Sequence, residues 1–127
     1  MPDRNISDQI AAKDIVGTWV LDEESLKLLK RDGYQDAERP HQIVFHEDGR
    51  CEYSSVEIFM PRIRYKSEKG IWELKHNIKE NYGTKANEIR LPVAGELNLA
   101  RKDGALILWD FYGDPDSWEF MEYKLKQ

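Results

Sequence analysis

From residue 41 onward, apolar residues gather in short runs separated by turn-forming sequences, and several of these runs alternate apolar with polar positions. A period of two is typical of β-strands that bury one face. Asp48-Gly49 and Asp103-Gly104 stand between runs and are typical of β-hairpins. We therefore expect strands at residues 15–21, 42–46, 50–56, 70–76, 89–93, 97–99, 105–112 and 118–126.

One segment departs from this alternation and predicts a helix. Asp22 is suited to cap its first turn, and basic residues lie near its end at Arg31. Gly33 can adopt the left-handed conformation that ends a helix. We also expect a short helical turn at residues 7–13 and polar loops at residues 35–40 and 76–86.

Sequential hairpins without a strand–helix–strand rhythm favour one antiparallel sheet. A sheet of that many strands removes its exposed edges by closing on itself. At 127 residues the chain can bury about two thirds of its unfolded surface, enough for a core without disulfides. We therefore expect a single domain over residues 1–127, a mainly β, eight- to nine-stranded antiparallel barrel with one helix between the first two strands.

Gly17-Thr18-Trp19, in the first predicted strand, resembles the Gly-x-Trp signature of lipocalins and the wider calycin group. The resemblance implies a barrel in which the glycine lets the strand bend and the tryptophan plugs one end while its N–H finds a partner. Gly70-Ile71-Trp72 is a second copy. The predicted helix is similar in place to the helical lid of fatty-acid-binding proteins. The last strand offers only Lys124 and Lys126 where lipocalins have an arginine, so the resemblance implies a fold and not a ligand.

Charge is distributed unevenly along the chain. The formal net charge of -5 divides into about -6 for residues 1–60, +4 for residues 61–90 and -3 for the remainder. An acidic chain argues against nucleic acid as a partner. No apolar run approaches the roughly 20 residues of a membrane span, and no signal-like segment precedes the first strand, so we expect a cytoplasmic protein. Cys51 is the only cysteine, which excludes an intramolecular disulfide.

Residues able to carry chemistry do not form a known catalytic pattern. The glycines are isolated at turns, which excludes a phosphate-binding loop. The three histidines do not pair at metal-ligand spacing, and Ser54 and Ser55 lack the glycines of a nucleophile elbow. The aspartates around Pro115 do not match a calcium loop. We expect no catalytic residue, metal or cofactor.

Aromatic residues are the strongest remaining signal, because they concentrate in the predicted strands. They either fill a small barrel or line a pocket for a flat apolar ligand. Two function hypotheses follow. The first is a non-enzymatic binding protein that acts through its surface on a protein partner, as bacterial immunity proteins act on a toxin, and the second is a carrier of a small hydrophobic ligand inside the barrel. An enzyme with scattered catalytic residues ranks third. The candidate barrel-end or pocket-lining residues are Trp19, Trp72, Trp109, Phe111, Trp118 and Phe120.

Overall fold

The computed structural model describes residues 10–59, 62–79, 85–92, 95–113, 116 and 118–126. One α-helix, α1 (Glu23–Arg31), and two short 3-10 helices, η1 (Ala12–Asp14) and η2 (Gln35–Glu38), accompany a single sheet. The strands of that sheet are β1 (Gly17–Leu21), β2 (Gln42–Phe45), β3 (Arg50–Phe59), β4 (Arg62–Ile71), β5 (Glu73–Lys79), β6 (Lys85–Arg90), β7 (Glu96–Lys102), β8 (Ala105–Phe111) and β9 (Phe120–Leu125).

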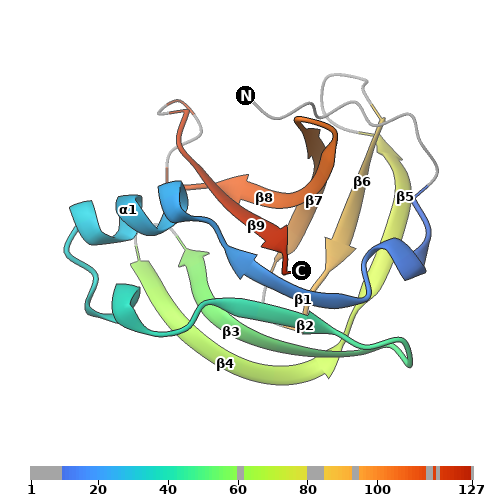
Figure 1. Cartoon of the computed structure of the whole chain (residues 1–127), viewed down its shortest axis with the longest axis horizontal. Coiled ribbons are helices and arrows are strands. Elements are labelled where there is room, and N and C mark those ends of the chain that lie inside the picture. The colour runs from blue at the N-terminus through green and yellow to red at the C-terminus, as the bar shows by residue number, and fades with distance from the viewer. Residues whose placement is uncertain are drawn as a thin grey trace.

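The nine strands are all antiparallel and follow the order β4-β3-β2-β1-β9-β8-β7-β6-β5. The first strand pairs with both β2 and β9, which brings the first and last strands together in the wall. The two outermost strands of the order, β4 and β5, are separated in the chain by Trp72 alone. The sheet therefore curves into a nearly closed barrel, with α1 between β1 and β2 (Figure 1). This confirms the predicted fold class.

The middle of the chain contains more strand than its sequence predicts. The prediction of one strand at residues 70–76 is wrong, because β4 already begins at Arg62 and pairs with β3 over ten residues. Polar and charged residues occupy both faces of β4, so the strand lacks the apolar alternation on which the prediction depended. The loop expected at residues 76–86 was also too long, because β5 continues to Lys79 and β6 begins at Lys85.

Helix α1 closes one end of the barrel, at the left of Figure 1. As predicted, the Asp22 carboxylate caps it by accepting a hydrogen bond from the Ser25 backbone N–H (2.8 Å), and Gly33 adopts a positive φ of 75°. Leu29 is fully buried in a cluster shared with β3, η2 and β9. The loop expected at residues 35–40 is instead largely η2, which packs Ala37 against α1. Of the turn expected at residues 7–13, residues 12 and 13 belong to η1, residues 10 and 11 are not helical, and residues 7–9 lie outside the described residues.

The Gly17-Thr18-Trp19 segment behaves as its sequence indicates. Gly17 has a φ of 138°, a value that side-chain-bearing residues rarely adopt. Trp19 is fully buried in the interior cluster, and its indole N–H donates to the Ile15 carbonyl at 2.7 Å. Gly17 thus begins β1 in a conformation that favours glycine, and Trp19 is a buried part of the interior with its N–H satisfied.

The second tripeptide, Gly70-Ile71-Trp72, has a different role. A Cβ atom at Gly70 would lie 2.5 Å from the Cβ of Pro92, so the glycine permits a close approach of the chain after β6. Trp72 is half-buried, packs edge-on against Phe45 and donates its indole N–H to the His46 carbonyl. This segment therefore fixes the junction of β4 and β5 against the β2–β3 turn.

Candidate functional site

The interior of the barrel is filled by its own side chains. Large residues from strands far apart in the sheet order, including Trp19, Phe45 and Leu99, have at most 2 % of their surface exposed. A cavity of about 40 Å³ remains beside Tyr53, Asp110 and Tyr123. A water needs roughly 10–15 Å³ by this measure, so the cavity has room for water-sized molecules and not for an organic ligand.

A chain of hydrogen bonds crosses the interior near α1. The His41 Nε2 atom lies 2.9 Å from the Asp36 carbonyl, which can only accept, so Nε2 carries the proton. In the neutral ring Nδ1 then accepts from the Ser55 hydroxyl at 3.1 Å, and Ser55 in turn accepts from the Tyr123 hydroxyl at 2.6 Å. The donor and the acceptor of each of these three hydrogen bonds are thereby assigned.

Burial sets the charge states around this network. It lowers the pKa of His41, which keeps the ring neutral, and it raises the pKa of Tyr123 and of the Asp110 carboxyl. A serine beside a histidine is also the arrangement of an activated nucleophile. Ser55, however, has no exposed surface, and the nearby cavity has no room for a substrate. The hydrogen bonds orient these polar groups inside the core, and burial favours their neutral forms.

Sequence reasoning missed this pair, although a signal for it exists. Gln42 pairs with Ser54 across β2 and β3, which places the preceding His41 opposite Ser55. Residue 41 shares its face with Ile43 and Phe45, both in the interior cluster. Had the register been known, alternation would have placed the histidine and the serine together inside the barrel.

The structure divides the six predicted aromatic site residues between two places. Trp19 and Trp72 belong to the interior cluster. Trp109, Phe111 and Phe120 form a separate cluster. Leu99 and Leu108, paired across β7 and β8, face the interior, so the neighbouring pair Ala100 and Ile107 and the residues alternating with them face outward. The second cluster therefore lies on the outer face of β8 and β9.

Rings pack edge-on within this outer cluster and lead to the sixth residue. The centroids of Trp109 and Phe111 are 5.2 Å apart, and those of Trp109 and Phe120 are 5.4 Å apart. Trp118 continues the series at 6.3 Å from Phe120, but 62 % of its surface is exposed. Its φ is 57°, a conformation that is unusual for a bulky residue.

Two hollows lie along β9. One lies on its outer face, and the other opens at the split between β8 and β9, where Trp19 and Leu106 of the interior cluster contribute to the lining. The first, about 240 Å³, lies between α1 and the start of β9 and contains Trp118. The second, about 480 Å³, lies where β9 parts from β8: their pairing begins at Ile107 and Lys124, while Leu125 pairs with β1. Lys102 lines both hollows and forms an ion pair at 2.9 Å with Glu122, which lines the first. We call the two hollows together the β9 groove.

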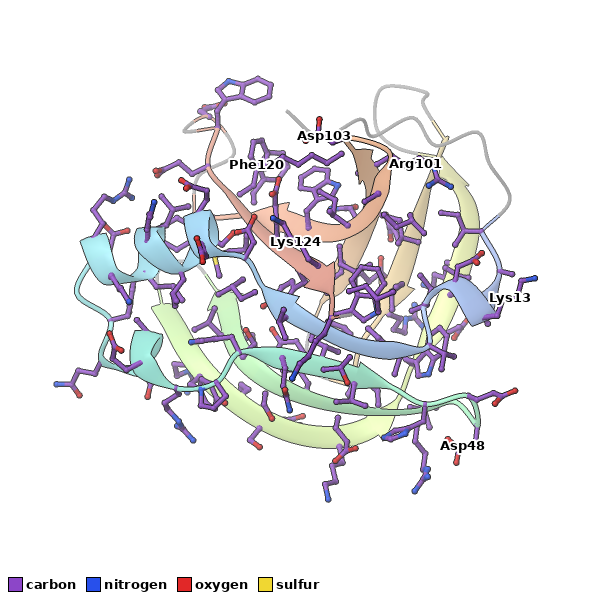
Figure 2. The ribbon with its side chains drawn as sticks, in the orientation of Figure 1. Lys13, Asp48, Arg101, Asp103, Phe120 and Lys124 are labelled. Carbon is purple, nitrogen blue, oxygen red and sulfur yellow. The ribbon has the colours of Figure 1, made fainter. Side chains whose placement is uncertain are left out.

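Several elements hold the walls of the β9 groove in place. The Ser25 hydroxyl of α1 accepts from the Glu122 backbone N–H at 2.8 Å, and the Asp22 N–H donates to the Glu122 carbonyl at 2.9 Å. These bonds fix the start of the helix against β9. Asp103 lies at the tip of the β7–β8 hairpin, and Figure 2 shows it in the upper part of the molecule with Phe120 and Lys124 of β9.

Carboxylates outnumber cations along the β9 groove. Arg31 forms a two-pronged ion pair with Glu119, and the hydrogen bond to Glu122 raises the pKa of Lys102. Beyond the Arg31–Glu119 pair, four carboxylates line the groove against two ammonium groups. The carboxylates are those of Asp14, Glu24, Asp103 and Glu122, and the ammonium groups are those of Lys102 and Lys124.

A third hollow, of about 440 Å³, lies over β3 and β4 and contains Ile71, which is 77 % exposed. Its charged lining is mixed and includes Arg50, Glu52 and Lys69. Two of the three large exposed apolar side chains of the described residues, Trp118 and Leu125, thus belong to the β9 groove, and Ile71 stands alone on another surface.

Within the described ranges, no group of three or more histidine, cysteine or carboxylate side chains is placed to hold a metal ion. In the same part of the chain, no helix has the length and apolar character needed to cross a membrane. Comparison with protein-family models, curated protein sequences and solved structures found no match.

Proposed function

We propose that this chain is a non-enzymatic binding protein that acts through its outer surface on another protein, in the manner of a bacterial immunity protein that neutralises a toxin. The observation that carries the proposal is a contrast between the interior and the surface. The interior is filled by side chains beside a cavity of about 40 Å³, whereas Trp118 on the surface is 62 % exposed. Tryptophan is the residue type most enriched at the energetic centres of protein interfaces.

The filled interior gives the carrier hypothesis less support. Small-molecule sites usually measure about 300–1,000 Å³, several times the cavity beside Tyr123. A ligand inside the barrel would have to displace side chains from opposite walls, at a cost of several kcal/mol. Native mass spectrometry of the protein recovered from its host separates the two hypotheses: a retained small molecule would support the carrier, and a retained protein of defined mass would support the proposal.

The direct test is a titration of the full chain with the product of the neighbouring gene in its source genome, followed by calorimetry. We expect a saturable complex of fixed stoichiometry, in which the neighbouring protein loses its activity. Absence of a complex at micromolar concentrations of both proteins would count against the toxin-neutralising function.

A further inference from the structure

We propose that the free edge of β4 is the docking site for an acidic, extended segment of the partner protein, which adds to the sheet as one more strand. This inference rests on the proposed function, because it names a contact surface and the partner chemistry for a protein that acts through its surface. Three properties of β4 carry it: an unpaired edge, a regular register and cations without an ion pair.

The edge of β4 that faces away from β3 has no partner strand in the described part of the chain. Strand β4 stands at one end of the sheet order, and in Figure 1 it forms the lower border of the molecule. Near Gly70 the strand approaches Pro92 closely, so the open part of the edge is residues 62–69. An edge of this kind presents a row of backbone donors and acceptors to which another extended chain can bind.

Two hydrogen bonds show which residues of β4 direct their backbone groups to the free edge. In an antiparallel sheet, successive residues point their N–H and C=O alternately toward one neighbour and the other. The Arg50 carbonyl accepts from the His46 N–H on the β2 side, and the Trp72 N–H donates to the Gly49 carbonyl. Because Arg50 pairs with Ile71, even-numbered residues of β4 face β3. The odd-numbered residues therefore direct their N–H and C=O groups to the free edge.

Of the two strands at the ends of the sheet order, β4 is the better template for an added strand. Its ten residues pair with β3 in unbroken register. In β5 the register shifts between Lys75 and Ile78, and a bulge of this kind blunts an edge. The Tyr65 hydroxyl donates to the Pro40 carbonyl at 2.6 Å, which directs this side chain across β3 and away from the free edge. The backbone of β4 is therefore open to pairing.

The side chains along this edge carry unpaired positive charge. Arg64 and Lys69 are exposed, Lys66 is half-buried, and none of the three forms an ion pair with another described residue. Glu68 is the only carboxylate between them. Glu52 stands opposite Lys69 in β3, but its carboxylate is bound at 2.7 Å by His46. The edge therefore attracts carboxylates.

The geometry of an added strand brings carboxylates close to these cations. Arg64 and Lys66 face β3 with their backbone groups, so they form non-hydrogen-bonded pairs with residues of a strand added on the other side. Side chains approach most closely in pairs of this kind. Glutamate or aspartate opposite Arg64 and Lys66 therefore adds specificity to the affinity that the backbone hydrogen bonds supply.

The same charges argue against a second copy of this chain as the occupant. Two β4 strands side by side would each bring Arg64, Lys66 and Lys69 against a single Glu68. Like charges on neighbouring strands are destabilising, and cations on an edge strand protect it from pairing with itself. An acidic segment gains from the charges that keep two copies apart.

The test is a titration of the full chain with a capped eight-residue peptide of valine, threonine and glutamate. Its glutamates are placed to face Arg64, Lys66 and Lys69 in an antiparallel pair. Binding is followed by calorimetry and by amide hydrogen exchange in two-dimensional NMR. In the free chain, the even-numbered amides of β4 should already be protected by β3. The peptide should add protection at the odd-numbered amides of residues 63–69.

Modified peptides distinguish strand addition from charge attraction alone. A methyl group on the peptide nitrogen opposite Ser67 removes a hydrogen bond to β4 and should weaken binding by roughly tenfold or more. A methyl group on the nitrogen opposite Lys66 points away from β4 and should weaken binding by less than about twofold. A peptide with lysine in place of glutamate should not bind. Equal effects of the two methyl groups, binding of the lysine peptide or no binding of the acidic peptide would overturn the proposal.

Variants of the chain make the same distinction from the other side. Ser67→Pro removes an N–H that faces away from β3, so the fold should be retained while peptide binding weakens by roughly tenfold or more. We expect Arg64→Gln and Lys69→Gln each to weaken binding by about two- to fivefold. Lys13→Gln and Lys124→Gln remove exposed cations elsewhere and should change it by less than about twofold. Equal effects of the two pairs of charge variants would contradict docking at β4.

Two further measurements identify the occupant and separate this inference from the proposed function. A dimer of the free chain in sedimentation, dissociated by Ser67→Pro, would overturn the acidic partner in favour of a second copy. If the neighbouring gene product binds the wild-type and Ser67→Pro chains equally well, the protein acts through its surface but not through β4. If that product does not bind while the acidic peptide adds to β4, the docking site stands and the toxin-neutralising function falls.

Discussion

Strands β8 and β9 hold aromatic and apolar side chains on both faces, but the two faces differ in how much apolar surface they leave exposed to water. Inward, Leu108 and Tyr123 pack in the closed interior cluster, and the Tyr123 hydroxyl is hydrogen-bonded to Ser55. Outward, Trp109 and Phe120 form the outer cluster, which leads to a tryptophan that is mostly in water. The inner face satisfies its own groups, whereas the outer face leaves apolar surface at the rim of a groove.

This difference shows which aromatic residues the fold requires. Burial of apolar surface contributes about 25 cal/mol per Å², so an indole left in water adds little to the stability of the chain itself. Trp19 and Trp118 are the two extremes of this comparison: Trp19 has no exposed surface, and Trp118 exposes 62 %. Substitutions on the two faces should therefore separate stability from binding.

The largest effect is expected from Trp19→Ala. Removing a fully buried tryptophan leaves a cavity, loses the hydrogen bond to the Ile15 carbonyl and should lower the free energy of unfolding by about 3–5 kcal/mol. Urea unfolding measures the loss. Trp118→Ala is the matched control and should change stability by no more than about 0.5 kcal/mol. Equal losses would mean that the outer face is as structural as the inner one.

Ser55→Ala should be the next most damaging substitution. It removes the hydroxyl between His41 and Tyr123 and leaves a buried acceptor and a buried donor without their partner. Each such group costs roughly 1–3 kcal/mol, so we expect a loss of about 2–4 kcal/mol in the same assay. Ser67→Ala, on the exposed part of β4, is the control and should be nearly neutral. A neutral Ser55→Ala would show that the buried chain of hydrogen bonds contributes nothing to stability.

A moderate loss is expected from Gly70→Ala. The new methyl group would lie 2.5 Å from the Cβ of Pro92, so the chain after β6 must move away from β4. Overpacking of this kind costs about 1–3 kcal/mol. Thermal unfolding measures the loss. Gly95→Ser is the control: a Cβ at Gly95 meets no atom within 4 Å, but its φ is 118°, so this substitution shows the effect of backbone strain without crowding. Unchanged stability of Gly70→Ala would mean that the close approach is not needed.

Acid should weaken the inner face through His41. Burial lowers the folded-state pKa of His41 below its ordinary value of 6.5, so the unfolded chain binds a proton more readily than the folded one. This contribution to stability is complete above pH 6.5 and is lost as the pH falls toward the folded-state pKa. We expect His41→Gln to remove that part of the pH dependence of unfolding between pH 7.5 and 5.5, and His46→Gln to retain it. Parallel wild-type and His41→Gln profiles would contradict the assignment.

The sequence was sufficient to predict the mainly β fold class and the position of α1, because the strands and the helix depend on local signals. Alternation, a capping aspartate and a glycine with positive φ act within a few residues. Strand β4 escaped prediction because its charged residues stand on both faces and show no apolar period.

The candidate groove could not be predicted for a different reason. Its parts come from α1, the β7–β8 hairpin and β9, and the sequence does not state how these meet. The sequence singles out the aromatic residues, but alternation alone does not say which face of β8 points inward. Only the pairing of Leu108 with Leu99, which belong to the interior cluster, places Trp109 and Phe120 outside.

The smallest expected effect, and the sharpest for this comparison, is the difference between Trp118→Gly and Trp118→Ala. At an ordinary position glycine is less stable than alanine, because it loses more backbone entropy on folding. With φ at 57°, the order should reverse, and the glycine variant should be more stable than the alanine variant by about 1 kcal/mol in urea unfolding. Such a reversal would show that the backbone conformation at Trp118 costs folding free energy. No contact on the inner face offsets that cost, whereas a bound partner would offset it. The usual order, with alanine more stable, would instead make Trp118 an ordinary exposed side chain and weaken the distinction between the two faces.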